Sequence, residues 1–338
     1  MTPVPAAFHW LSLLALLVAA AFASATVGRF HIPLADVWQI LGRWLTGALS
    51  PETMEERILV NVRLPRILLA AIVGAGLALC GAALQALFRN PLVSPRVLGL
   101  SSGAALGGAL TLLVGGGAVM LFAATFASAL AALVLVAAIS HVAGRTILTI
   151  VLAGIVIDAL FSAMISLTQY VADPETSLPA IVFWLMGSFS SSSWEKVARH
   201  GPIVLLAIAV LYRLRFRIAV LSMGEEEARS FGVNVQVSRW LVFTVISVIV
   251  GGCVAVSGVI GWVGLVVPHA ARLLVGEGHR RFHGTAALLG AAFLVAVDTL
   301  ARTVTSAELP LGILTAVIGA PVFIYLLCTR RTRGGPVR

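Results

Sequence analysis

The chain has 338 residues, of which 59% are hydrophobic and only 11% are charged, and its mean hydropathy is +1.03. Because soluble domains carry about 25% charged residues, this composition excludes an ordinary soluble protein and indicates a polytopic membrane protein. The net charge of +9 is typical of arginines that set topology in cytoplasmic loops, so it does not point to a nucleic-acid partner. With Lys196 as its single lysine, the chain cannot contain a Gly-Lys-Ser/Thr phosphate-binding loop.

Apolar runs divide the chain into candidate transmembrane helices, since a bilayer core requires about 17 to 25 apolar residues per helix. We predict an all-α fold with ten such helices, over residues 10–27, 67–88, 97–115, 119–140, 147–170, 197–214, 240–256, 259–275, 285–303 and 311–328. Ala23-Ser24-Ala25 resembles a signal-peptidase site after the first run. However, no Lys or Arg precedes that run, so we interpret it as a retained helix.

The arginines set the predicted topology. An even number of spans places both termini on the same side, and most arginines lie in cytoplasmic loops if that side is the cytoplasm. We therefore expect residues 1–338 to form one transmembrane domain with both termini in the cytoplasm. Closely spaced glycines, such as Gly103 and Gly107, predict tight packing between helix backbones.

The second predicted helix has unusual residues near both ends. Arg63 and Arg66 lie at its outer end, and Arg302 lies at the outer end of the ninth helix, against the positive-inside trend. Asp298 is four residues from Arg302 on one helical face and could pair with it. At the inner end, Pro91 removes a backbone donor and disfavours helix before it. Such irregular backbone is tolerated within a membrane where it lines a cavity.

A charged stretch between the sixth and seventh helices, residues 221–234, has the sequence Leu-Ser-Met-Gly-Glu-Glu-Glu-Ala-Arg-Ser-Phe-Gly-Val-Asn. It concentrates three glutamates, residues 225–227, in a chain with only 14 acidic residues. Ser222 can cap a short helix, the glutamates would occupy the first turn beside the positive end of its dipole, and Gly232 can end it. The stretch therefore predicts a compact charged helix on the cytoplasmic face.

Other residues with chemical potential give weaker signals. Cys80, Cys253 and Cys328 lie singly in apolar runs without Cys-x-x-Cys spacing, so we interpret them as small core residues. Asp158, in the fifth helix, is the main candidate for the buried ionisable group that an ion-coupled secondary transporter would need. A membrane-embedded enzyme would need a cluster of His, Asp, Glu or Ser on adjacent helices, and we find no convincing one.

Six stretches, in order, carry a resemblance to a known family: Arg63-Leu-Pro-Arg66, Gln85-Ala-Leu-Phe-Arg-Asn-Pro-Leu92, Leu98-Gly-Leu-Ser-Ser-Gly103, Phe183-Trp-Leu-Met-Gly-Ser188, Gly261-Trp-Val-Gly-Leu-Val-Val-Pro-His269 and Glu308-Leu-Pro-Leu-Gly312. Together they are similar to the membrane permeases of type II ABC importers, which take up iron-siderophores, haem and vitamin B12. The match covers about residues 60–328. The Pro-His pair occurs in relatives with different cargo, so we interpret His269 as structural rather than as a metal or haem ligand.

The resemblance implies a transport subunit of a bacterial inner membrane, not an enzyme. It would form a homodimer in the lipid bilayer, joined by two copies of a cytoplasmic ATPase and one periplasmic binding protein. ATP and Mg would be bound by the ATPase, while this chain itself would hold no cofactor and no metal.

The resemblance also assigns roles to individual residues. Coupling helices at about 218–236 would dock on the ATPase, and the residues concerned are Ser222, Gly224, Glu225, Glu226, Glu227, Arg229 and Gly232. Arg63, Arg66 and Arg302 would receive glutamates of the binding protein, as guanidinium geometry suits carboxylates. A cytoplasmic gate would involve Asn90 and Leu92, opposed by Thr146 and Thr149, although relatives tend to carry Ser and Thr side by side at the latter place.

Haem is the cargo that the sequence favours, because the stretch 183–188 and the serine run 190–193 are most similar to haem permeases. Ferric siderophores and vitamin B12 are the alternatives, since the binding protein largely sets selectivity in such systems.

Overall fold

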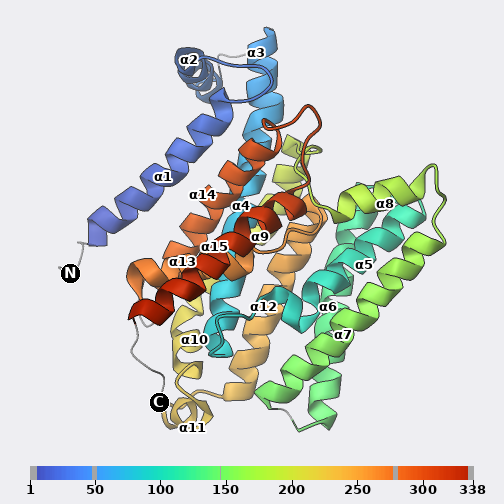
Figure 1. The fold of residues 1–338 in the computed structure, drawn as a ribbon, viewed down its shortest axis with the longest axis vertical. Coiled ribbons are helices and arrows are strands. Elements are labelled where there is room, and N and C mark those ends of the chain that lie inside the picture. Colours follow the sequence, from blue (N-terminus) through green and yellow to red (C-terminus); the bar gives the residue numbers. More distant parts are fainter. Residues whose placement is uncertain (1–5, 48–51, 145, 277–280, 334–338) are drawn as a thin grey trace.

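The computed structural model describes residues 6–47, 52–144, 146–276 and 281–333, and every regular element in these ranges is a helix (Figure 1). The elements are α1 (Ala6–Thr26), α2 (Leu34–Leu45), α3 (Met54–Arg57), η1 (Ile58–Arg63), α4 (Leu64–Leu87), η2 (Pro95–Leu98), α5 (Leu100–Leu113), α6 (Ala118–Val142), α7 (Ile147–Tyr170), α8 (Ser177–Leu185), α9 (Trp194–Arg213), α10 (Arg215–Leu221), α11 (Glu225–Ser230), α12 (Val235–Ser257), α13 (Val263–Val275), α14 (Phe282–Ala301) and α15 (Leu311–Arg333).

Each of the ten predicted spans falls on one of these helices, so the predicted all-α polytopic fold is confirmed. Within the described ranges, six helices are long and apolar enough to cross a membrane: α1, the continuous helix Met54–Leu87, α6, α7, α12 and α14. Helices α5, α13 and the apolar part of α15 are shorter. Helix α9 has 20 residues but carries charges near both ends, such as Glu195 and Arg213. The count of ten spans and the cytoplasmic termini stay predictions.

Helix α4 is the centre of the bundle and contacts α14, α13, α9 and α12. Its predicted start at the Arg-Leu-Pro-Arg stretch is wrong, because a single helix runs from Met54 through η1 into α4. The start is fixed by a capping box. The Thr53 hydroxyl accepts from the Glu56 N–H at 3.3 Å, and a Glu56 carboxylate oxygen accepts from the Thr53 N–H at 3.2 Å.

A proline inside this continuous helix explains the wrong prediction. Pro65 has no N–H, so it leaves a carbonyl of the preceding turn without its helical donor. The chain widens there into the π-helical turn η1, in which bonds join residues five apart. The carbonyl of Val60, five residues before the proline, instead accepts a hydrogen bond from the Trp194 indole at 2.8 Å. A tertiary contact thus replaces the lost backbone bond and lets the helix continue.

Small residues bring the central helices into backbone contact. A Cβ atom on Gly74 of α4 would lie 2.2 Å from the carbonyl oxygen of Gly290 on α14, so the two backbones touch. Gly107 of α5 lies equally close to α6, where an added Cβ would meet the Ala124 carbonyl oxygen at 2.3 Å. The predicted close packing through glycine is therefore confirmed at these crossings.

Two short helices were not predicted. Helix α2 is amphipathic, and only Val37 and Ile40 of its twelve residues are buried. Helix α8 follows α7 after a turn and packs on α5. Figure 1 shows α2 and α3 at one end of the molecule and α10 and α11 at the other, with α4 between these ends. By the predicted topology, the first is the outer end and the second is the inner, cytoplasmic end.

Candidate functional site

The three arginines that were predicted at the outer end form one buried cluster. Arg63 in η1, Arg66 in α4 and Arg302 after α14 are 4%, 6% and 8% exposed. Arg63 and Arg302 flank the same residue, Gly28, where an added Cβ would lie 2.7 Å from a guanidinium nitrogen of each. The cluster therefore ties the end of α1 to α4 and α14.

Arg66 is paired within the chain by two carboxylates. Its Nε lies 2.8 Å from Oδ2 of Asp298, and its second terminal nitrogen donates to Oδ1 of the same residue at 2.8 Å. Both terminal nitrogens also donate to the carboxylate of Glu308 at 3.0 Å. The expected hydrogen-bonded pair of Asp298 with Arg302 is thus wrong: across the bundle Arg66 offers a forked, two-point contact, and Asp298 takes it.

Arg63 and Arg302 bind main-chain carbonyls at the C-terminal end of α1. Arg63 donates to the carbonyls of Ala25, Thr26 and Phe30, and Arg302 donates to the carbonyl and the hydroxyl of Ser24. The last turn of a helix leaves carbonyls without helical partners and carries the negative end of the dipole. Two cations at this point stabilise the turn in which α1 ends.

The geometry does not test docking of a binding protein, but it shows what such docking would meet. All three guanidiniums already have partners inside the chain, and the most exposed member of the cluster is the Glu308 carboxylate, whose side chain is 32% exposed. Glu308 begins the stretch Glu308-Leu-Pro-Leu-Gly312, but the sequence did not predict a role for its carboxylate. No local pattern could predict it, because its partner Arg66 lies 242 residues away.

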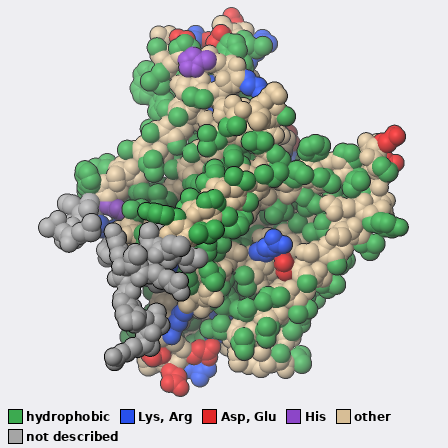
Figure 2. Space-filling model, in the orientation of Figure 1, with side chains coloured by type: hydrophobic (Ala, Val, Ile, Leu, Met, Phe, Trp, Pro, Cys, Tyr) green, Lys and Arg blue, Asp and Glu red, His purple; other side chains and the backbone are tan. Residues whose placement is uncertain are grey.

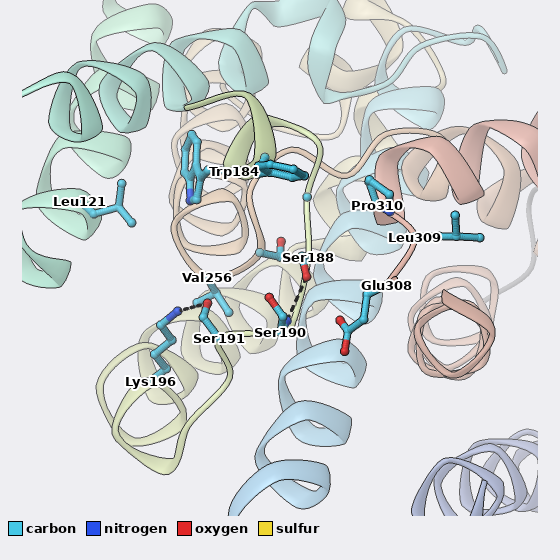
Figure 3. Close-up of a pocket in the computed structure, with 13 residues that line it drawn as sticks. Leu121, Trp184, Ser188, Ser190, Ser191, Lys196, Val256, Glu308, Leu309 and Pro310 are labelled. Carbon is cyan, nitrogen blue, oxygen red and sulfur yellow. Dashed lines mark hydrogen bonds between the residues drawn. The ribbon is translucent and has the colours of Figure 1, made fainter. Parts of the chain in front are cut away.

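A pocket of about 390 Å³ opens next to this cluster. Figure 3 shows Lys196 and Glu308 at different sides of it, with Ser188, Ser190 and Ser191 between them. The Lys196 ammonium donates to the Ser191 hydroxyl at 2.6 Å. Burial lowers the pKa of Lys196, and the nearby Glu195 charge partly opposes this shift. Parts of the serine run and of the stretch 183–188, which suggested haem, thus lie on the wall of this pocket, which combines apolar side chains with serines and two charged groups.

At the inner end, α10 and α11 occupy the predicted coupling segment. The predicted end of the short helix at Gly232 is confirmed, as this residue has φ +74° and donates to the Arg229 carbonyl at 2.9 Å. The N–H of Val233 reaches the Ala228 carbonyl at 3.1 Å, which completes a Schellman motif. The predicted cap by Ser222 is wrong: Gly224 is the N-cap, and the Ser222 hydroxyl donates back to the Ala219 carbonyl.

Two arginines outside the predicted set anchor this segment. The buried Arg239 of α12 donates to Glu225 at 2.5 Å, and Arg229 lies 3.5 Å from the same carboxylate. Arg89, directly after α4, donates from Nε to the Ser222 carbonyl at 2.5 Å. Glu226 and Glu227 are exposed. One glutamate of the three therefore fixes α11 to the bundle, and the other two remain on the surface.

The predicted gate residues lie at breaks between helices. The Asn90 side-chain carbonyl accepts from the Leu92 N–H at 2.9 Å, and both residues are exposed. Thr146 caps α7 by accepting from the Thr149 N–H at 3.1 Å. The first residue of α7, Ile147, lines a cavity of about 250 Å³ together with Arg89, Gly224 and Glu225. The start of α7 and the coupling segment therefore line the same cavity, while the gating role itself stays a prediction.

The remaining candidates from the sequence that lie in the described part of the chain are either buried or paired with another residue. His269 is fully buried and makes an edge-to-face contact with Phe323, with ring centroids 5.8 Å apart. Cys80 and Cys253 are free and buried. The side chain of Cys328 lies outside the described residues. Asp158, the candidate for ion coupling, lies 3.5 Å from Arg96.

The sequence matches known transport proteins along nearly its whole length. The model of the FecCD transport family matches residues 16–329. The molybdate import system permease protein MolB of Haemophilus influenzae is 43% identical over 321 residues, which are 95% of this chain and 95% of that protein. The hemin transport system permease protein HmuU of Yersinia pestis is 37% identical and covers 94% of this chain and 95% of its own length.

A solved structure of a transport protein has the same fold as this chain. It is described as an inward-facing conformation of a metal-chelate type ABC transporter. The two chains are 40% identical and superpose with a TM-score of 0.84, over 94% of this chain and 98% of the other. The resemblance stated from the motifs is confirmed.

Proposed function

The chain belongs to the FecCD transport family, and we propose that it pairs with a second copy of itself to form the pathway of an ATP-driven importer in a bacterial inner membrane. It is an ABC importer permease, because its family consists of such transport subunits and not of enzymes. The proposed partners are two copies of a cytoplasmic ATPase, which would bind ATP and Mg, and a periplasmic binding protein.

The observation that best supports this proposal is the attachment of α11 to two central helices. Glu225 of α11 pairs with Arg239 of α12, and the carbonyl of Ser222 accepts from Arg89 at the end of α4. A force applied to α11 by an ATPase would therefore reach α12 and α4 through short, charge-assisted contacts. The exposed face with Glu226, Glu227 and Phe231 is free to contact that partner.

The outer end would receive the binding protein, with Arg63, Arg66 and Arg302 beneath the docking surface. Because these side chains are already paired inside the chain, we propose that they hold the docking surface in shape. Direct contact with glutamates of the binding protein would require the loop after α1, residues 27–33, to move aside.

Two cargo candidates have specific support. Haem is supported by the stretch 183–188 on the wall of the outer pocket and by the relative that is named for hemin transport. Molybdate is supported by the relative of 43% identity that is named for molybdate import. An ion-coupled secondary transporter is a weaker alternative, since Asp158 has Arg96 as a charge partner.

ATP-driven uptake into liposomes tests the proposal. The permease would be reconstituted with the ATPase and the binding protein encoded next to it, and offered haem, molybdate, a ferric siderophore and cobalamin. We expect ATP-dependent uptake of one cargo. Uptake that responds to a proton uncoupler but not to loss of the ATPase would refute the importer proposal.

A further inference from the structure

One ion pair lies halfway along a membrane-spanning helix and has no role in the machinery described above. Nε of Arg96 lies 3.5 Å from Oδ2 of Asp158, and the side chains are 73% and 22% exposed. Asp158 is the twelfth residue of the 24-residue helix α7. At 1.5 Å per residue it lies about 17 Å from the start of the helix, which is the depth of the bilayer centre.

The short helix η2, which carries Arg96, reaches the same depth and packs closely on α7. A Cβ on Gly154 of α7 would lie 2.1 Å from the Val97 carbonyl oxygen, and one on Gly99 would lie 2.9 Å from Cγ2 of Ile157. The chain from residue 88 to 99 is therefore largely non-helical backbone at membrane depth. Such backbone is tolerated only where it is buried in protein or lines a water-filled cavity.

Lipid is a poor environment for this pair. Exposed neighbours on α7 are apolar, among them Ile155, Val156 and Leu160, and a charge facing the bilayer centre is costly. Figure 2 shows a face on which charged groups lie mainly at the top, at the bottom and at the right-hand edge, while its middle is mostly hydrophobic apart from one basic and one acidic group that lie together. An exposed guanidinium at this depth needs water or a polar ligand.

We propose that Arg96 faces the transport pathway and binds the negatively charged groups of the cargo, with Asp158 as a positioning residue. This inference rests on the proposed function, because the pathway lies between two copies of the chain. Asp158 is near Nε of Arg96, and within the described residues no hydrogen bond is formed by the two terminal nitrogens. Those nitrogens form a fork that matches a carboxylate or a tetrahedral oxyanion. The cargo is thus an anion: either a chelate with carboxylates, such as haem, or a metal oxyanion, such as molybdate.

Cysteine labelling tests where Arg96 faces. Arg96→Cys and Leu11→Cys would each be placed in a Cys328→Ser chain, since the other two cysteines are buried. Leu11 is an exposed apolar residue of α1 and serves as the lipid-facing control. We expect a charged, membrane-impermeant thiol reagent to label position 96 in the reconstituted complex and not position 11. Failure to label position 96 in any state of the ATPase cycle would overturn the proposal.

Uptake measurements test the recognition of charge. Arg96→Gln is expected to lower uptake of the anionic cargo by about tenfold through a higher KM, the usual effect of losing a charge-assisted hydrogen bond, while Arg96→Lys keeps most of it. Stimulation of the ATPase by the binding protein should not change in either variant. A loss with haem identifies carboxylates as the ligand, and a loss with molybdate identifies the oxyanion. Uptake by Arg96→Gln equal to that of the parent overturns the inference. If the parent itself transports none of the cargoes, the proposed function fails, whereas the labelling result still decides where Arg96 faces.

Discussion

Replacement of Arg66 by Met keeps an unbranched but shorter side chain and removes its charge, which leaves the carboxylate of Asp298 buried without its partner. Asp298 is 1% exposed, and removing one member of a buried ion pair costs about 3–5 kcal/mol. Glu308 is 32% exposed on its side chain, so water can replace most of its contact and its share is about 1 kcal/mol or less. For a chain of this size, the expected fall in Tm is roughly 5–10 °C.

The assay is thermal unfolding of the purified permease in detergent, followed by tryptophan fluorescence. The double variant Arg66→Met with Asp298→Leu is expected to regain most of the lost stability, because it leaves no fully buried charge without a partner. Only the Glu308 carboxylate then lacks its arginine, and water reaches it. Glu308→Gln is the matched control and should cost no more than about 2 °C. The reasoning is refuted if Arg66→Met leaves Tm unchanged and only weakens binding of the periplasmic protein. Such a result would show that Arg66 serves docking and not the internal pair.

Three further predictions concern other parts of the chain. Glu225→Gln removes the ion pair to α12 and should lower ATP-driven uptake about tenfold in an assembled complex, whereas Glu175→Gln, in the exposed turn after α7, should not. Equal losses would contradict a coupling role for the pair. Gly28→Ala places a methyl group 2.7 Å from two guanidinium nitrogens and should lower Tm. Gly42→Ala in α2, with no atom within 4 Å of the new Cβ, should instead stabilise the protein by about 0.5–1 kcal/mol. A Gly28→Ala variant as stable as the parent would show that the arginines are not held there. Hydrogen bonds from the hydroxyl and the backbone N–H of Thr176 lower the pKa of Asp173. They therefore stabilise this turn above the ordinary Asp pKa of about 4, and the stabilisation is lost as pH falls through the lowered pKa. Hydrogen exchange should show that protection of the Thr176 amide falls in acid, and Asp173→Asn should remove this pH dependence.

Apolar periodicity was sufficient to locate the long helices, because length and hydrophobicity are local properties of the chain. It failed at the start of α4, where Pro65 normally indicates a helix boundary. There the π-helical turn and the indole of Trp194 compensate for the missing backbone donor. It also missed α2, because the search was for long apolar runs, and this twelve-residue amphipathic helix has Asp36, Gln39 and Arg43 between its apolar residues. The compensation at Pro65 depends on a contact between segments far apart in sequence, whereas α2 is too short and too polar to be read as a span.

The candidate site was predictable where it depends on one segment. The end of α11 at Gly232 follows from a local turn, and the charged loop was evident from its composition. The partners of the charges were not predictable. Asp298 pairs with a residue 232 positions away, although Arg302 lies one helical turn from it. A bidentate guanidinium on a facing helix satisfies both carboxylate oxygens, and the sequence contains no record of which helices face each other.

Helix α4 joins the two ends of the molecule and does so without a flexible step. The helix Met54–Leu87 has 34 residues, about 50 Å at 1.5 Å per residue. It is fixed to α14 at two levels, by the Arg66–Asp298 pair at the outer end and by the backbone contact of Gly74 with Gly290 further in. Two fixed points prevent these helices from sliding or rotating separately, so a displacement that α11 passes to α4 would carry α14 and the outer cluster with it. Relative motion is then left to the less buried helices. Of the residues in the apolar part of each helix, 11% are buried in α1 and 28% in α6 and in α7, against 78% in the helix that contains α4. The end of α1 is held by Arg63 and Arg302, which leaves α6 and α7. Opening and closing of the proposed transport pathway should therefore occur beside α7, where Asp158 pairs with Arg96, rather than along the α4–α14 contact.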